Sequence, residues 1–236
     1  MRPRHWTGWT LALVFWLAGV GACGARGGEA PASGADVAFW QGVLQEAQSR
    51  EDAEGGLLRA AAYINLGRII DALDEVDRLS ALAYQEVARL LVPRYEAAVA
   101  ASPGDRVALN CLVFGYYALE QMDAAIAVLR HLIAVDAANP WPRNLLAIAL
   151  LTREQYGAAR GVAQEALTLD PLNEYSHLIL AYAYLHERDY LRFLSHYWQG
   201  RGAARELQRY LARQEAKAYH PEQTLGVRAA GDGVSG

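Results

Sequence analysis

Apolar residues recur along most of the chain at the three- and four-residue spacing of amphipathic helices. One face of the first expected helix contains Phe39, Val43, Leu44 and Ala47. A second helix is expected from about Gly56 to Leu79, and Pro93 should kink or restart the helix that contains it, because proline lacks a backbone N–H. No run combines strict alternation with the enrichment in Val, Ile and Thr that is typical of strands. The pattern predicts an all-α fold.

The middle of the chain repeats itself at an offset of 34 residues. Leu112 aligns with Leu146, and Ala125 aligns with Ala159. The consecutive copies are 106–139, 140–173 and 174–207. A fixed period of this length indicates stacked units, each of which buries its apolar face only against its neighbours.

The repeat resembles the tetratricopeptide repeat, a 34-residue helix-turn-helix unit with small residues where its helices cross. In the copy at 140–173, Ala159 stands at one of these close-packed positions. The third copy has Phe193 where the family has a small alanine, so its second helix should pack differently, as a terminal cap. The resemblance implies a right-handed superhelical solenoid of antiparallel helix pairs over 104–217, preceded by a degenerate helical part over 37–103.

The first 22 residues, 1–22, have the pattern of an export signal. Two arginines precede an apolar run at 11–20, which has about the length of a secretory signal core and falls short of the roughly 20 apolar residues of a membrane span. The run ends in Val20-Gly21-Ala22-Cys23, which resembles the lipobox of bacterial lipoproteins and implies that Cys23 is lipidated. Cleavage without lipidation and an uncleaved anchor are the alternatives.

The segments that flank the helical region lack apolar periodicity. Residues 23–36 are small and turn-prone, so we expect a lipidated flexible tether. Residues 218–236 have little apolar content and should form a disordered tail. These features together predict a protein that is exported and held by its lipid on the periplasmic side of a bacterial membrane.

Composition excludes several classes of protein. Of the 236 residues, 53% are hydrophobic and 20% charged, with 22 Lys+Arg against 26 Asp+Glu and a net charge of −4. This mildly acidic balance argues against nucleic acid as the main partner. The two cysteines cannot form a disulfide framework or a cysteine-rich zinc site, and Cys111, which lies among apolar residues, should be a small buried hydrophobe.

In the tetratricopeptide-repeat family, the first helices of successive repeats line a concave surface, and here the alignment places large apolar and aromatic side chains on it. Monomeric proteins rarely expose such a surface without a use, and aromatic side chains dominate binding hot spots. An amide side chain there can pair with both polar groups of a bound backbone. The expected groove residues are Val107, Asn110, Phe114, Tyr117, Trp141, Asn144, Ile148, Leu151, Tyr175, Leu178, Tyr182 and His186.

This groove is nearly free of positive charge, so its expected ligand is an apolar or helical protein segment rather than an acidic C-terminus. Other interpretations remain open. Trp141, between two prolines, would staple the start of a helix, and Asn110 and Asn144 would satisfy neighbouring backbone groups. The helices within 37–80 would fold into the concave face, and the protein itself would then fill the groove.

The last expected helix carries a basic residue at every fourth position. These residues are Arg201, Arg205, Arg209, Arg213 and Lys217. A solvated capping helix accounts for this stripe, because terminal repeats need a polar outer face. An acidic partner or anionic lipid headgroups are the alternative.

The sequence offers no candidate set for catalytic or metal chemistry, and we expect no enzyme activity and no cofactor. None of the six histidines pairs at the i, i+4 spacing of a helical zinc site. His186 and His196 straddle a predicted turn, where a solvated or capping role is favoured over mutual approach. The sequence therefore favours a non-catalytic scaffold or adaptor of the cell envelope. A periplasmic small-ligand carrier or transporter-associated repeat lipoprotein is the alternative, and a closed cavity lined by Trp141, Tyr175 and Tyr182 would support the carrier.

Overall fold

The structure, a computed structural model, describes residues 34–81 and 84–219. The expected export signal, Cys23, nearly all of the tether and the C-terminal tail lie outside these residues. Within them the chain is all-α, as the hydrophobic pattern predicts, and forms 11 helices. Among the described helices, none combines the length and the apolar content that a membrane crossing requires.

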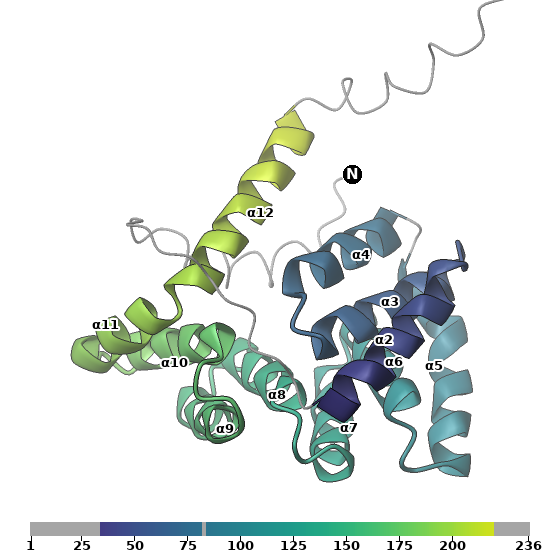
Figure 1. The fold of residues 1–236 in the computed structure, drawn as a ribbon, viewed down its shortest axis with the longest axis horizontal. Coiled ribbons are helices and arrows are strands. Elements are labelled where there is room, and N and C mark those ends of the chain that lie inside the picture. The colour runs from purple at the N-terminus through teal and green to yellow at the C-terminus, as the bar shows by residue number, and fades with distance from the viewer. Residues whose placement is uncertain (1–33, 82–83, 220–236) are drawn as a thin grey trace, which may run out of the picture.

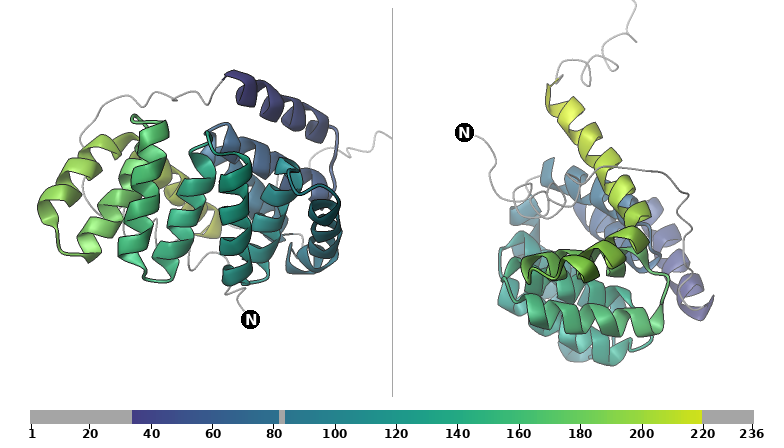
Figure 2. Two further views of the ribbon diagram at one scale, coloured as in Figure 1. Left: turned by 90° about the horizontal axis from the view of Figure 1, so that it is seen from below. Right: turned by 90° about the vertical axis from the view of Figure 1, so that its left-hand side faces the viewer.

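Most of the helices pair into antiparallel hairpins that follow one another along the chain (Figure 1). The hairpins are α3 (Ala53–Asn65) with α4 (Ile69–Ala81), α6 (Arg106–Ala118) with α7 (Met122–Val135), α8 (Trp141–Thr152) with α9 (Tyr156–Leu169), and α10 (Glu174–His186) with α11 (Tyr190–Gln199). The remaining helices are α2 (Gly34–Gln48), α5 (Tyr84–Ala101) and α12 (Arg201–Tyr219). Figure 2 shows the helices from α6 to α11 side by side in chain order, which is the stacking of a helical solenoid.

The backbone reproduces the 34-residue period at the turns between paired helices. Glu120, Glu154 and Arg188 have φ angles of 59°, 59° and 61°, in the left-handed region that ends many helices. Each turn is closed by a backbone hydrogen bond to the fifth residue back, for example from Gln155 N to the Leu150 oxygen at 2.9 Å. The left-handed residues therefore mark the same point of each predicted repeat.

The same turn occurs once more upstream, where the sequence predicted a single helix. Gly67 has a φ of 76°, and Arg68 N donates to the Tyr63 oxygen at 2.8 Å. The expected helix from about Gly56 to Leu79 is therefore wrong, because the left-handed turn splits it into the α3–α4 hairpin. The expectation for Pro93 is also corrected in part, since α5 continues through this exposed residue without restarting.

Small residues bring the stacked helices close together. Ala147, Ala159 and Ala181 are completely buried at the positions where the repeats cross. Larger side chains such as Leu129 and Leu180 fill the space between these contacts. At the N-terminal end α2 buries Trp40 completely against α3, whereas Phe39, which the pattern placed on the buried face, is partly exposed and lies under the Arg106 guanidinium at 4.1 Å.

Candidate binding surfaces

The α3–α4 hairpin packs on one half of the predicted groove. Asn65 of α3 donates to the Asn110 side-chain oxygen at 2.9 Å and accepts from the Asn139 side chain at 2.7 Å. A Cβ built on Gly67 would lie 3.2 Å from the Trp141 ring, so the turn of the hairpin touches the start of α8. The chain's own residues thus cover this half of the concave face, which is the arrangement that the sequence left open for the helices within 37–80.

The two groove asparagines make their hydrogen bonds within the chain. Asn110, 1% exposed, also donates to the Arg106 carbonyl oxygen at 2.8 Å. Asn144, 2% exposed, accepts from the Ser176 hydroxyl at 2.8 Å and donates to the Asn173 side chain at 3.4 Å. Buried amides with these hydrogen bonds fix the spacing of neighbouring repeats. Their polar groups are already used within the chain.

Helix α12 packs on the other half of the groove. Leu178 of α10 is 2% exposed and forms one cluster with Ala203, Ala204 and Leu207 of α12. Gly200 permits this approach, because an added Cβ would lie 2.7 Å from the Glu174 carbonyl oxygen and 2.9 Å from the Leu178 nitrogen. Both of these atoms belong to the backbone of α10, so a side chain at this position would push α12 away.

Polar contacts hold α12 at its N-terminus and again from its middle onward. The Glu174 carboxylate accepts from Ala203 N at 2.7 Å and so caps the N-terminus of the helix. From the middle of the helix onward, Asp77 of α4 accepts hydrogen bonds from the Tyr210 hydroxyl and the Gln214 amide. The right-hand view of Figure 2 shows α12 running obliquely beside α4. The concave face is therefore covered by the α3–α4 hairpin and by α12, and α4 meets α12.

The predicted groove residues fall into three groups by exposure. Phe114, Trp141, Leu151 and Leu178, together with both asparagines, are buried; Val107, Tyr117, Ile148, Tyr175 and Tyr182 are half-buried; and His186 is exposed. The aromatic side chains pack on one another and on the covering helices. Trp141 meets Tyr175 edge-on at 5.9 Å, and the Tyr175 hydroxyl donates to Glu206 of α12 at 2.9 Å. These contacts place the aromatic side chains in a packed interface between helices.

His196, for which the sequence favoured a solvated or capping role over approach to His186, is paired with another histidine. His196 Nδ1 lies 2.9 Å from His177 Nδ1, and His177 Nε2 lies 3.2 Å from the Pro171 carbonyl oxygen. Because a carbonyl only accepts, His177 carries its hydrogen on Nε2 and accepts at Nδ1 from His196. Burial lowers the pKa of both histidines, and the proximity of His177 lowers that of His196 further. His186 stacks on Tyr156 with ring centroids 4.4 Å apart.

The basic stripe of α12 is divided between different contacts. Arg201 donates to the Trp198 carbonyl oxygen at 2.7 Å, and its guanidinium lies over the Trp198 ring at 4.5 Å. Arg213 approaches Asp74 of α4 at 3.6 Å. Arg205 is half-buried, Arg209 is exposed, and the side chain of Lys217 lies outside the described part of the chain. The stripe thus does not form a single solvated surface over the end of the solenoid.

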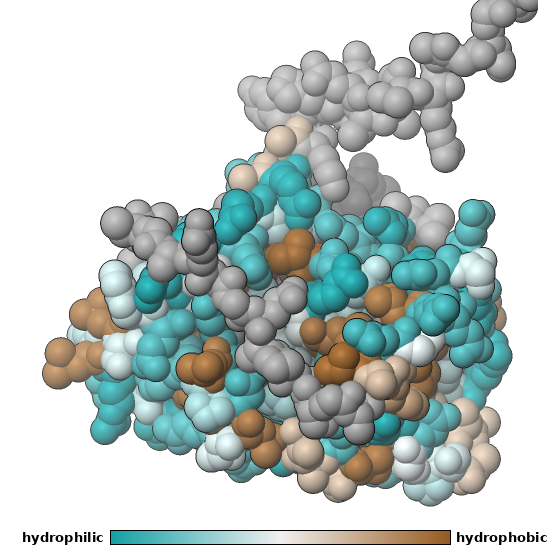
Figure 3. Space-filling model, viewed as in Figure 1, coloured by the Kyte–Doolittle hydropathy of each residue, from teal (hydrophilic) through white to brown (hydrophobic). Residues whose placement is uncertain are grey.

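An exposed apolar stripe on α11 is the main feature that the sequence analysis missed. In Figure 3, hydrophobic side chains gather over the end of the molecule where α11 lies. The stripe consists of Tyr190, Leu191, Leu194 and Trp198, which are between 56% and 83% exposed. Their spacing of one, four and eight residues from Tyr190 was a readable signal, because it places all four side chains on one side of a helix.

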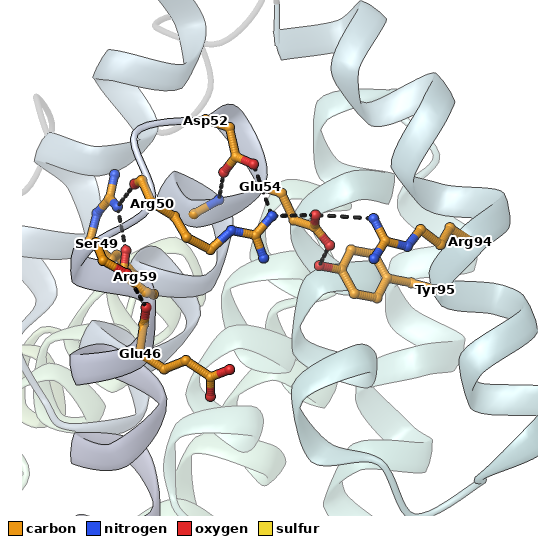
Figure 4. Close-up of polar contacts among 10 residues, drawn as sticks. Glu46, Ser49, Arg50, Asp52, Glu54, Arg59, Arg94 and Tyr95 are labelled. Atoms are coloured by element: carbon orange, nitrogen blue, oxygen red, sulfur yellow. Dashed lines mark hydrogen bonds and ion pairs between the residues drawn. The ribbon is translucent and has the colours of Figure 1, made fainter.

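A polar cluster at the start of α3 has a structural role (Figure 4). Glu54 accepts from Arg50 at 2.6 Å, Arg94 at 3.0 Å and the Tyr95 hydroxyl at 2.9 Å, which ties α3 to α5. Burial raises the pKa of Glu54, but the hydrogen bonds from Arg50 and Tyr95 outweigh it and leave this pKa below its usual value. Its carboxylate is thus charged and fully engaged.

Cys111 and the acidic and histidine side chains form no metal site in the part of the chain that the structure describes. Cys111 is buried as a free thiol, and burial raises its pKa to about 12, so it is unreactive at neutral pH. No group of three or more His, Cys, Asp or Glu side chains among the described residues is placed to hold a metal ion.

Comparisons with known proteins give matches among solved structures. No protein-family model matches the chain. The search of curated proteins found no match to it either. The solved structures that it resembles include MamA from residue 41 to the end from Desulfovibrio magneticus RS-1, with 18% identity and a TM-score of 0.48 over 75% of this chain and 97% of that one. A second MamA crystal structure has 13% identity and a TM-score of 0.48 over 79% of this chain and 96% of that one.

Proposed function

We propose that this protein is a non-catalytic adaptor whose concave face holds a helical protein segment. The observation that carries the proposal is the position of α12, a helix that packs along α10 on residues predicted to bind such a segment. Ala203, Ala204, Leu207, Tyr210 and Leu211 of α12 are all buried. Their spacing of three, four and seven residues is that of helices that bind in grooves.

The contacts of α12 define the class of partner. Small residues at the first turn let the helix approach α10 closely, and a leucine one turn later fills the space beside Leu178. The Glu174 carboxylate caps the bound helix, and Asp77 accepts hydrogen bonds from its middle and second half. The partner is therefore an amphipathic helix with small residues near its N-terminus. It would compete with α12 for the same surface.

The setting of the adaptor is the bacterial cell envelope, with a lipid on Cys23 as the membrane anchor. The lipobox-like Val20-Gly21-Ala22-Cys23 supports this setting. A Cys23→Ser variant should gain no acyl mass, whether or not its N-terminal segment is removed. A larger share of the variant than of wild type should be found outside the membrane fraction. Unchanged mature mass and unchanged partitioning in Cys23→Ser would reject lipidation while leaving the role of the concave face untouched.

The concave face can be tested with a synthetic peptide of residues 201–219 as the probe. In wild type, α12 is part of the chain and competes with added peptide for the concave face at an effective concentration on the order of millimolar. The peptide should therefore bind to wild type at least about tenfold more weakly than to a variant whose own α12 is displaced. Gly200→Ala should displace α12, because the added Cβ meets the backbone of α10. Gly161→Ala is the matched control, since no atom lies within 4 Å of its added Cβ.

Fluorescence anisotropy of the labelled peptide and hydrogen exchange of residues 201–219 are the two measurements. We expect faster exchange in α12 and peptide binding in Gly200→Ala, and neither in Gly161→Ala. Leu207→Asp, which places a charge in the cluster around Leu178, is a second way to displace α12. If exchange shows that α12 has left in either variant and the peptide still fails to bind, the concave face is not a receptor for helices.

A further inference from the structure

The apolar stripe of α11 lies on the side of the helix that faces away from the solenoid. At about 100° per residue, Tyr190, Leu194, Trp198 and Leu191 span roughly a quarter to a third of the helix circumference. Phe193, which is 8% exposed, points into the core from another side of the same helix. Leu191 is 83% exposed and Trp198 is 60% exposed. Helix α11 is thus apolar on two sides, and only one of them is packed.

This stripe is open because α12 does not continue the stack. In a solenoid the next helix pair covers the outer side of the last one, and terminal repeats usually present a polar surface there. Here α12 turns inward at Gly200, packs on α10 and reaches α4. The position that a further repeat would occupy beside α11 is therefore exposed, with side chains that water solvates poorly.

The end of the solenoid is basic although the whole chain is acidic. Residues 188–201, which span α11 and the turn after it, contain 3 Lys and Arg against 1 Asp and Glu, a net charge of +2, in a chain whose net charge is −4. Arg192 of α11 has a side chain that is 61% exposed, and the Arg201 guanidinium lies over the ring of Trp198. Arg192, which also pairs with Asp189 at 3.2 Å, and Arg201 thus place cationic groups beside an apolar stripe that contains both a tryptophan and a tyrosine.

We infer that α11 docks on the surface of a bilayer that contains anionic phospholipid, with Leu191, Leu194 and Trp198 at the boundary between headgroups and acyl chains. A helix with leucine and aromatic residues on one side and arginines beside them is suited to this position. Tryptophan and tyrosine favour this boundary because their rings are amphipathic. Each arginine near the surface adds attraction to anionic headgroups.

A second copy of the chain fits the stripe less well than a membrane does. Pairing of two α11 helices would bring two segments of net charge +2 together, counted over residues 188–201, which costs free energy through like-charge repulsion. Head-to-tail stacking would need a matching apolar surface at the other end of the solenoid. There the exposed large apolar side chains that the structure describes are Phe39, partly covered by Arg106, and Leu90.

The experiment places a fluorescent label on the stripe in the full chain. The Cys23→Ser background leaves Cys111, whose burial and pKa of about 12 keep it unlabelled. Leu191→Cys then carries an environment-sensitive dye, and Leu90→Cys on α5, with a native side chain that is 79% exposed, is the matched control. Vesicles of phosphatidylcholine with phosphatidylglycerol, and vesicles of phosphatidylcholine alone, contain a spin-labelled lipid that quenches the dye.

The proposal expects quenching that depends on position and on charge. With phosphatidylglycerol present, the dye at 191 should lose at least about half of its fluorescence and the dye at 90 less than about a tenth. High salt should reduce the loss at 191, as should the additional change Leu194→Ser. Because the background lacks Cys23 and the dye reports on α11 alone, the result is independent of lipidation and of the concave face.

Three results would overturn this inference. Equal quenching at 191 and 90 would show adsorption without orientation, and equal quenching in the two kinds of vesicle would remove the role of anionic lipid. Absence of quenching at 191 would assign the stripe to a protein instead. If the dye at 191 becomes shielded from a water-soluble quencher as protein concentration rises without vesicles, a second copy of the chain is the occupant.

Discussion

Replacement of Gly67 by alanine tests how the α3–α4 hairpin is seated on the concave face. Gly67 adopts a φ of 76° at the turn, and an added Cβ would lie 3.2 Å from Cζ2 of Trp141. The left-handed conformation costs a residue with a Cβ roughly 1–2 kcal/mol. Alanine also reduces the conformational entropy of the unfolded chain, which stabilises the folded state by about 0.4–1 kcal/mol. With tighter contact at Trp141 added, we expect Gly67→Ala to lower the free energy of unfolding by about 1–2 kcal/mol.

Two matched variants separate these contributions. Gly161→Ala lies in α9 with no neighbouring atom within 4 Å of the added Cβ, so it should raise the free energy of unfolding by about 0.5–1 kcal/mol through better helix propensity. Glu154→Gly removes a Cβ from a left-handed position equivalent to Gly67, so relief of strain and loss of chain stiffness should nearly cancel.

The assay is urea-induced unfolding followed by circular dichroism, with tryptophan fluorescence as a second probe because Trp141 lies beside the substituted residue. Coincident transitions by the two probes are required before the free energies are compared. Gly67→Ala as stable as wild type would contradict the left-handed turn and its contact with α8. If Gly161→Ala lowered the free energy of unfolding by the same amount, the effect of Gly67→Ala could not be assigned to the left-handed turn.

Two further predictions concern titratable groups. Glu54→Gln should lower the free energy of unfolding by about 1–3 kcal/mol at neutral pH, because Glu54 accepts three hydrogen bonds, whereas exposed Glu46→Gln should change it by less than about 0.5 kcal/mol. The pKa of Glu54 is lowered on folding, so its contribution is present above its unfolded value of 4.5 and is lost as pH falls, which should make Glu54→Gln less sensitive to acid in urea titrations. Burial lowers the pKa of His177 and His196 below their unfolded value of 6.5, so the unfolded chain binds more protons and stability falls as pH falls below about 6.5. His196→Asn should show a smaller loss than wild type between about pH 7 and 5, and an equal slope in the two proteins would contradict the buried neutral pair.

The repeat was predictable because its core positions have strict size requirements. Ala125 and Ala159 are completely buried one period apart, and no larger side chain would fit where the helices cross. The turns were less visible, because Glu154 and Arg188 take the left-handed conformation without the glycine that normally signals it. Gly67 provides that signal, but α3 and α4 lack the repeat's sequence pattern, so the hairpin was interpreted as one helix.

The candidate site was predictable only as a set of positions. The alignment placed Asn110, Trp141 and Leu178 on the first helices of their repeats, where the structure also has them. What covers them depends on contacts between segments far apart in the chain, such as Asn65 with Asn139 and Tyr210 with Asp77. Periodicity reports which face of a helix is apolar and not which segment packs on it. The only sequence signal for the close approach of α12 to α10 is the group of small residues that follows α11.

The closed concave face and the open side of α11 have a common origin in the direction that the chain takes at Gly200. Because α12 turns inward there, it fills the groove and at the same time leaves the apolar stripe uncovered. A released α12 would be free to reach that stripe, and its own apolar side, with Leu207 and Leu211 buried in the present arrangement, would then need a new partner. Gly200→Ala should therefore lower the lipid quenching of a dye at Leu191 as well as open the groove. If quenching at this position is unchanged while α12 exchanges faster, the two surfaces are independent, and a partner helix bound in the groove would not alter docking on the membrane.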